Sequence, residues 1–223
     1  MGKFLSKEYV IRVFIVLLAN IMAPFGLTFL RLSCLGTDPF SAFAYNLSEM
    51  LHLPLVVFML GTHLVLFFAM FPYMKKYIGI GMIINMTVYG IAADFWKSIV
   101  LSILPLKDNY VGFEALFLRI VMMVAGLFIL VFFISFYIAS DTGMSPYDGF
   151  SYALEKKFPC FPFKIWRIIQ DGSFFVLAFI SGVLRGNPWT VIGVATVIMV
   201  FFIGPVISFF REKIADPLFA RLK

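Results

Sequence analysis

The stretch that decides the fold is Gly36-Thr-Asp-Pro-Phe-Ser-Ala-Phe-Ala-Tyr-Asn-Leu47, because the chain repeats it. The second copy, Gly143-Met-Ser-Pro-Tyr-Asp-Gly-Phe-Ser-Tyr-Ala-Leu154, lies 107 residues later, and five of the twelve positions are identical. The opening glycine of each copy, Gly36 or Gly143, permits a sharp turn of the backbone. Each copy stands between two long apolar segments. The repeat therefore predicts one short structural unit in each half of the chain.

Both copies have the pattern of a helix start. Asp38 or Ser145 can accept a backbone N–H group as the N-cap residue. Pro39 or Pro146 follows at the first helical position, where the missing N–H group costs nothing. The apolar residues that follow recur at helical spacing. We expect two short capped helices, over residues 39–51 and 146–157.

The composition places the chain among membrane proteins. Of its 223 residues, 62% are hydrophobic and only 13% are charged, which is outside the range of ordinary soluble domains. No P-loop, His-Glu-x-x-His, Gly-x-Ser-x-Gly or paired-cysteine motif occurs. We therefore expect no enzyme activity, no cofactor and no metal site. The net charge of +6 fits the basic flanks of a protein with many spans and does not indicate a nucleic-acid partner.

Six apolar runs are long enough to cross a bilayer, which needs about 20 helical residues. They cover residues 9–30, 53–71, 78–101, 113–138, 163–184 and 189–210. Thirteen Lys and Arg residues, Arg167 among them, fall on one side of this arrangement, and five, Lys107 among them, fall on the other. The positive-inside rule then places both termini in the cytoplasm. The polar loop at 104–110 is the midpoint of the chain.

The repeat extends beyond the opening motif. Gly90 and the segment after it match Gly204 at an offset of 114. Each half, 1–104 and 105–223, reads as a span, a capped short helix and two further spans. Three spans per half mean that the second half enters the membrane from the opposite side, as in the inverted repeats of secondary transporters. The predicted fold is an all-α polytopic membrane protein in which the capped helices, re-entrant or not, approach from opposite faces. It places Cys34 and Cys160 on opposite sides.

At these residues the sequence resembles the YczE/YyaS/YitT group of bacterial integral membrane proteins. The pattern of that group includes a Gly-x-(Ser/Gly/Asp)-Pro-(Trp/Phe/Tyr)-(Asp/Ser) turn in each half, and both copies here match it. The resemblance covers nearly the whole chain. It implies a multi-pass protein of the bacterial plasma membrane, with transport as an expected activity. The sequence departs from the group at Phe40 and Tyr147, where tryptophan is common.

Polar residues inside the apolar runs need a reason, because an ionisable group near the bilayer centre costs about 2.5–3.5 kcal/mol on insertion scales. Asp171, beside Gln170, lies well inside the fifth run, and the aligned position in the first half is His63, at an offset of 108. One interpretation is a pair that couples protons or cations. The other is a hydrogen bond that pins two helices together. Asn20 and Asn46 are expected to pin helices in the same way.

A second group of polar residues belongs to the two capped turns. Carboxylates are favoured at a helix N-terminus by the helix dipole, so capping alone explains Asp38 and Asp148. A role in ligand binding is the alternative. On that reading the substrate-binding residues are Asp38, Pro39, Ser41, Ser145, Pro146, Tyr147 and Asp148.

Two functions compete. The first is a small secondary transporter that binds a small solute between the two proline-led helices, coupled to protons or cations through Asp171, Gln170 and His63. The second is a non-transporting membrane protein that assists the assembly or regulation of another complex. The expected partners are the lipid bilayer, a small solute, and a second copy or another membrane protein. A cavity that touches Pro39, Pro146 and Asp171 favours transport, and a closed core favours the second function.

Overall fold

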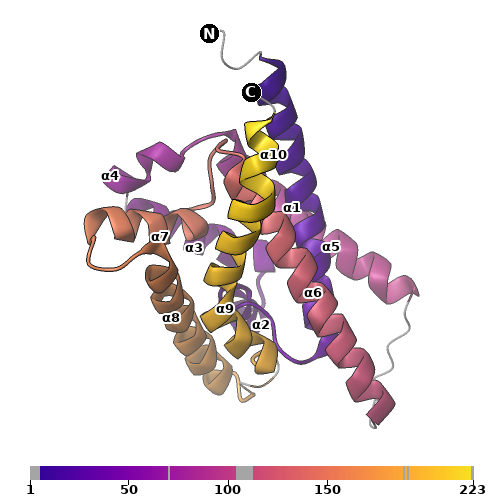
Figure 1. Ribbon diagram of the computed structural model, residues 1–223. Helices are drawn as coiled ribbons and strands as arrows, with labels where there is room; N and C mark the ends of the chain where they lie inside the picture. Colours follow the sequence, from indigo (N-terminus) through magenta and orange to yellow (C-terminus); the bar gives the residue numbers. More distant parts are fainter. Residues whose placement is uncertain (1–5, 70, 104–112, 188, 190, 222–223) are drawn as a thin grey trace.

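The computed structural model describes residues 6–69, 71–103, 113–187, 189 and 191–221, and all regular structure within them is helical (Figure 1). The elements are α1 (Lys7–Ser33), α2 (Pro39–Leu51), α3 (Leu55–Ala69), α4 (Phe71–Met74), η2 (Lys75–Tyr77), α5 (Ile80–Ile103), α6 (Phe113–Ala139), α7 (Pro146–Lys157), α8 (Phe163–Leu184), α9 (Val194–Phe210), η4 (Arg211–Ala215) and α10 (Asp216–Ala220). The predicted midpoint loop at 104–110, with Lys107, lies outside the described residues.

Four helical segments in the described part of the chain are long and apolar enough to cross a membrane. They are α1, most of α6, α8, and the continuous run from α9 to α10. α3 is apolar but has only 15 residues. α5 has 24 residues, but Asn85, Asp94 and Lys97 lower its apolar character. Length and composition are therefore those of a helical membrane protein.

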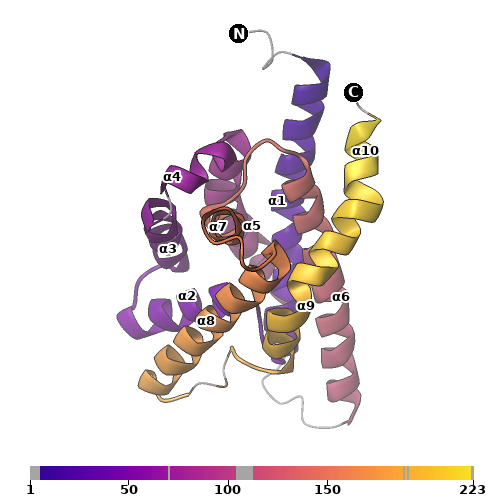
Figure 2. The ribbon, with the colours of Figure 1, turned by 60° about the vertical axis from the view of Figure 1, so that its left-hand side comes forward.

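The two capped helices form where the sequence predicts them. α2 begins at Pro39 and the Oδ1 atom of Asp38 accepts the N–H group of Ser41 at 2.8 Å. α7 begins at Pro146 and the Oγ atom of Ser145 accepts the N–H group of Asp148 at 3.0 Å. Both caps are confirmed. In Figure 2, α7 is seen end-on and α2 from the side, so the two helices do not run parallel.

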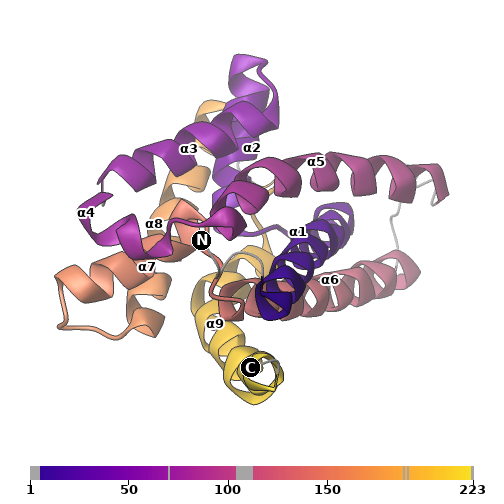
Figure 3. The same ribbon diagram turned by 90° about the horizontal axis from the view of Figure 1, so that it is seen from above.

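Helices α1 and α6 form the centre of the fold. They lie side by side and run in opposite directions (Figure 1), and α1 stands between α5 and α6 in the view from above (Figure 3). Gly26 and Gly126 let the two backbones approach closely, because a Cβ atom on Gly26 would lie 2.6 Å from the carbonyl oxygen of Gly126. Leu27 and Leu130, each 1% exposed, pack in the core around this crossing. The start of α1 and the end of α10 lie at the same end of the molecule (Figure 1).

The two glycine turns make matching backbone contacts. Thr37 donates its N–H group to the carbonyl of Val191 at 3.1 Å, and Met144 donates to the carbonyl of Tyr77 at 3.0 Å. The two donors, Thr37 and Met144, are 107 positions apart, and the two acceptors, Tyr77 and Val191, are 114 positions apart. These are the offsets at which the sequence repeats. Each turn is thereby held by the segment just before the third long helix of the opposite half.

The glycines of the turns are required by the backbone. Gly36 has a φ angle of +110° and Gly143 one of +109°, a region that residues with a side chain rarely adopt. A Cβ atom on Gly36 would lie 2.7 Å from the nitrogen of Gly193, and one on Gly143 would lie 2.7 Å from the nitrogen of Gly79. Both glycines therefore lie in turns where a larger residue would be strained.

Buried amides connect the helices. Asn85 of α5 donates to the side-chain oxygen of Asn20 of α1 at 2.6 Å. Asn46 of α2 donates to the carbonyl of Ala178 of α8 at 2.8 Å. The expectation that Asn20 and Asn46 pin helices together is confirmed, and the second bond joins the two halves of the chain.

Candidate functional site

A cavity lies between the two capped helices. The space in it where the centre of a water molecule fits is about 60 Å³, enough for a few water molecules or a small chemical group. Its walls come from both halves of the chain. The lining residues are Asp38, Pro39, Phe40, Ser41, Met59, His63, Asn85, Tyr89, Leu130, Ile134, Ser145, Tyr147, Asp148, Arg167, Asp171 and Ile203.

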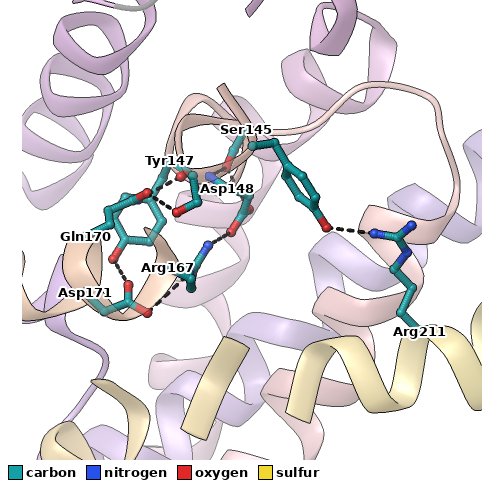
Figure 4. A network of polar contacts seen from close by, with 9 residues as sticks. Ser145, Tyr147, Asp148, Arg167, Gln170, Asp171 and Arg211 are labelled. Carbon is teal, nitrogen blue, oxygen red and sulfur yellow. Dashed lines mark hydrogen bonds and ion pairs between the residues drawn. The ribbon is translucent and has the colours of Figure 1, made fainter. Parts of the chain in front are cut away.

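Arg167 is the central charged residue of this cavity (Figure 4). Its side chain is only 3% exposed, and it donates from Nη1 to Asp148 at 2.8 Å and from Nε to Asp171 at 3.0 Å. The guanidinium carbon also lies 4.7 Å from the centre of the Tyr147 ring, within the range of a cation–π interaction. Two carboxylates and an aromatic face thus compensate the burial of one cation.

Tyr147 connects α7 to α8. Its hydroxyl donates to Asp171, and its backbone carbonyl accepts the side-chain amide of Gln170 at 2.8 Å. Gln170 in turn accepts the hydroxyl of Ser151 at 2.5 Å. Figure 4 shows Tyr147, Gln170 and Asp171 close together. The first turn of α7 is therefore fixed to α8 through both side-chain and backbone atoms of one residue.

Asp148 has its position set by its own helix as well as by Arg167. It stands three residues after the N-cap of α7, and the hydroxyl of Ser145 donates to its Oδ2 atom at 2.7 Å. The helix dipole favours a carboxylate at this place. The first turn of α7 thus presents a carboxylate to the cavity with its orientation already fixed.

The side of the cavity built by the first half of the chain is less fully paired. The ring of His63, on α3, stacks on Phe40 of α2 at a centroid distance of 4.9 Å. His63 is 7% exposed, and its Nδ1 atom has no hydrogen-bond partner among the described residues. Phe40 also contacts Tyr147 at 4.5 Å, so aromatic rings from the two halves meet at the centre of the site.

Most of the predicted site residues come together in this one cavity. The lining includes Asp38, Pro39, Ser41, His63, Ser145, Tyr147, Asp148 and Asp171. Pro146 is buried in the first turn of α7 but does not line the cavity. Gln170 supports Tyr147 from behind. Gly36 and Gly143 lie in the turns that lead to the capped helices.

Arg167 does not have the environment of a cation that flanks a span. The sequence interpretation places it among the cations on the cytoplasmic side, whereas in the structure its side chain is buried and paired with Asp148 and Asp171. The spacing of Arg167 and Asp171, four residues apart in an apolar run, is the signal that indicates an ion pair on one helix face. Met59, Asn85 and Tyr89 also line the cavity, and nothing in the repeat pattern singled them out.

A second and wider hollow lies near the start of α1 and the end of α10, with about 880 Å³ open to the centres of water molecules. Its lining includes Arg12, Tyr152 and Arg211, and Arg211 donates to the hydroxyl of Tyr152 at 2.7 Å. Met144, which also lines this hollow, is the neighbour of Ser145 in the central cavity. Two consecutive residues of the turn before α7 thus line the two different spaces.

The fold and this site define a class: an all-helical protein whose described part has four helices long and apolar enough to cross a membrane, with a buried, charged cavity between two short capped helices. Residues 10–212 match the Family of unknown function (DUF6198), and the chain belongs to that family. Comparison with curated proteins and with solved structures found no match for the chain.

Proposed function

We propose that this protein is a small secondary transporter, made of two inverted repeats of three spans each, which binds a small solute in the cavity between α2 and α7. The observation that carries the proposal is that residues at equivalent positions of the two halves line one cavity. Residues at equivalent positions of the two halves line the same space: Asp38 with Ser145, Phe40 with Tyr147, Ser41 with Asp148, Met59 with Arg167, and His63 with Asp171. A shared site at the interface of two repeats is the arrangement of inverted-repeat transporters.

The backbone contacts of the two turns support the same internal symmetry. Thr37 and Met144 occupy equivalent positions, and so do their acceptors Val191 and Tyr77. The antiparallel crossing of α1 and α6, the first long helix of each half, agrees with halves that thread the membrane in opposite senses (Figure 1). On this proposal the protein has six spans in the bacterial plasma membrane, both termini lie in the cytoplasm, and the chain is of the YczE/YyaS/YitT type.

The buried charges support a site that moves a solute. Ionisable residues at membrane depth are costly, and in other proteins they mark substrate or proton pathways. Asp171 faces the cavity and is bonded to both Arg167 and Tyr147. We assign it the coupling role, with His63 opposite. The wider hollow beside Met144 would give access from the cytoplasmic side.

One observation favours the second candidate function, a non-transporting partner of another membrane complex. The charge of Arg167 is already satisfied by Asp148 and Asp171 at 2.8 Å and 3.0 Å. A network whose charges pair with one another can fix α7 against α8 without binding a solute. In that case a partner protein would bind elsewhere on the surface.

Uptake by proteoliposomes separates the two functions. The purified protein is reconstituted and screened with labelled amines, amino acids and carboxylates, beside Asp171→Asn and the control Asp94→Asn. Asp94 is an exposed residue of α5 outside the cavity. Uptake that is lost in Asp171→Asn and kept in Asp94→Asn supports transport. Uptake that is equal in both variants removes the coupling role of Asp171. No uptake at all, together with a co-purifying membrane protein, favours the second function.

A further inference from the structure

The two sides of the cavity differ in charge although their backbones correspond. In the second half, Arg167 stands between Asp148 and Asp171. In the first half, 108 residues earlier, the equivalent position is Met59, which also lines the cavity. Asp38 forms no ion pair within the described part of the chain. Among the described residues that line the cavity, the second half contributes a cation and the first half contributes none.

The negative charges that line the cavity exceed the positive charges by about one. Three carboxylates line it, those of Asp38, Asp148 and Asp171, against the single guanidinium of Arg167. The N-termini of α2 and α7 each contribute a partial charge of about +0.5. About one negative charge therefore stays uncompensated by the groups that line the cavity. Arg31, near the end of α1, does not line the cavity, and among the described residues it forms no ion pair with Asp38 and its buried Nη2 atom has no hydrogen-bond partner.

His63 is a second, independent indication of a ligand on the side of the cavity that the first half builds. It is 93% buried, it lines the cavity, and its Nδ1 atom has no partner among the described residues. A buried polar atom without a partner is costly, and a neutral imidazole offers one nitrogen that accepts a hydrogen bond. Such an atom, in the same cavity as an uncompensated carboxylate, is suited to a ligand that carries both N–H groups and a positive charge.

We infer that the cavity binds a small monovalent cation with N–H donors, an ammonium or guanidinium group, between Asp38 and His63. The ligand would take the part that the guanidinium of Arg167 plays in the other half, with His63 at the position equivalent to Asp171. Its carboxylate partner would be Asp38, because Ser41 stands at the position equivalent to Asp148. This inference rests on the inverted repeat of the proposed function, because that symmetry equates Met59 with Arg167. The small volume of the cavity, about 60 Å³ open to water centres, restricts the ligand to a compact head group.

Binding is measured on the detergent-purified full chain, by calorimetry and by thermal shift, so that the result does not depend on transport. The probes are methylguanidinium and methylammonium chloride, with tetramethylammonium chloride and sodium chloride at equal ionic strength as comparisons. We expect saturable binding of a probe that has N–H groups and none of tetramethylammonium, which has no donor. Asp38→Asn should weaken binding at least tenfold, and asparagine is itself a good N-cap residue, so α2 keeps its start.

A second variant tests the correspondence between the halves. Met59→Arg supplies an internal guanidinium at the place assigned to the ligand, so it should abolish binding of the probes. The control Asp94→Asn, at an exposed residue outside the cavity, should bind as the wild type does. The inference is overturned if no N–H cation binds saturably, if Asp38→Asn binds with unchanged affinity, or if sodium binds and the N–H cations do not. Binding without uptake would refute transport alone, and uptake of a neutral or anionic solute without cation binding would refute this inference alone.

Discussion

Arg167 donates to the carboxylate of Asp148 across 2.8 Å, from the second turn of α8 to the first turn of α7, with the arginine side chain only 3% exposed. Both residues of this ion pair line the cavity. A buried charge that loses its partner is strongly destabilising, whereas replacing the whole set by neutral groups is often tolerated. The contact between these two residues therefore gives the first test of the site.

Arg167→Ala should lower the stability of the purified protein by about 3–5 kcal/mol, because two buried carboxylates lose their cation. The apparent melting temperature in detergent measures the loss. Lys164→Ala is the control, because Lys164 is an exposed residue of the same helix. The triple variant Arg167→Met, Asp148→Asn, Asp171→Asn should recover part of the stability. A single variant as stable as the wild type would show that the ion pairs do not form.

Tyr147→Phe removes the hydroxyl that donates to Asp171 and keeps the ring that packs against Arg167 and Phe40. A buried acceptor that loses its donor costs about 1–3 kcal/mol, so the melting temperature should fall by less than in Arg167→Ala. Tyr73→Phe, on α4 and outside the cavity lining, serves as the control. Equal melting temperatures for the two variants would contradict the bond to Asp171.

Gly36→Ala and Gly143→Ala should each destabilise the protein by at least about 1–3 kcal/mol, since a side chain at positive φ is strained and the new Cβ atom would meet backbone atoms. Gly61→Ala is the matched control, because a Cβ atom there meets nothing within 4 Å and alanine favours a helix. The thermal shift of the three variants is compared. Similar effects at Gly36 and Gly61 would refute the tight contact of the first turn with Gly193.

Asn20 and Asn85 should be energetically coupled, because the amide of one donates to the other at 2.6 Å inside the fold. A double-mutant cycle with both alanine variants should give a coupling energy between about 0.6 kcal/mol, the average for hydrogen bonds between membrane helices, and about 1.7 kcal/mol, the largest value for such bonds. The cycle is read from unfolding in mixed detergent. Additive effects of the two substitutions would mean that α1 and α5 do not use this bond.

The sequence predicts the features that depend on local chemistry. Asp38 and Ser145 begin helices because their side chains can bond N–H groups three residues on, and this geometry needs no tertiary contact. The cavity lining was also predictable in large part, because the two copies of the motif carry most of its polar residues. The glycines at Gly36 and Gly143 are likewise a local signal, because their positive φ angles suit glycine.

The features that the sequence interpretation missed depend on contacts between distant segments. Arg167 looks like a cytoplasmic cation until Asp148, 19 residues away, is seen to face it. The sixth apolar run was expected to be helical from residue 189, but α9 begins at Val194. The backbone before it is held instead by Thr37, which bonds the carbonyl of Val191. The spacing of apolar residues within the run does not indicate this contact with a distant segment.

The central claim is that the two halves thread the membrane in opposite senses, and the two native cysteines test it most directly. Cys34 follows α1, Cys160 precedes α8, and both are exposed. The variants Cys160→Ser and Cys34→Ser each keep one thiol, which is treated with a membrane-impermeant maleimide in intact cells and again after permeabilisation. We predict that Cys34 reacts from outside and that Cys160 reacts only after permeabilisation. Reaction of both thiols from the same side would contradict the inverted repeat and the cavity assignment built on it.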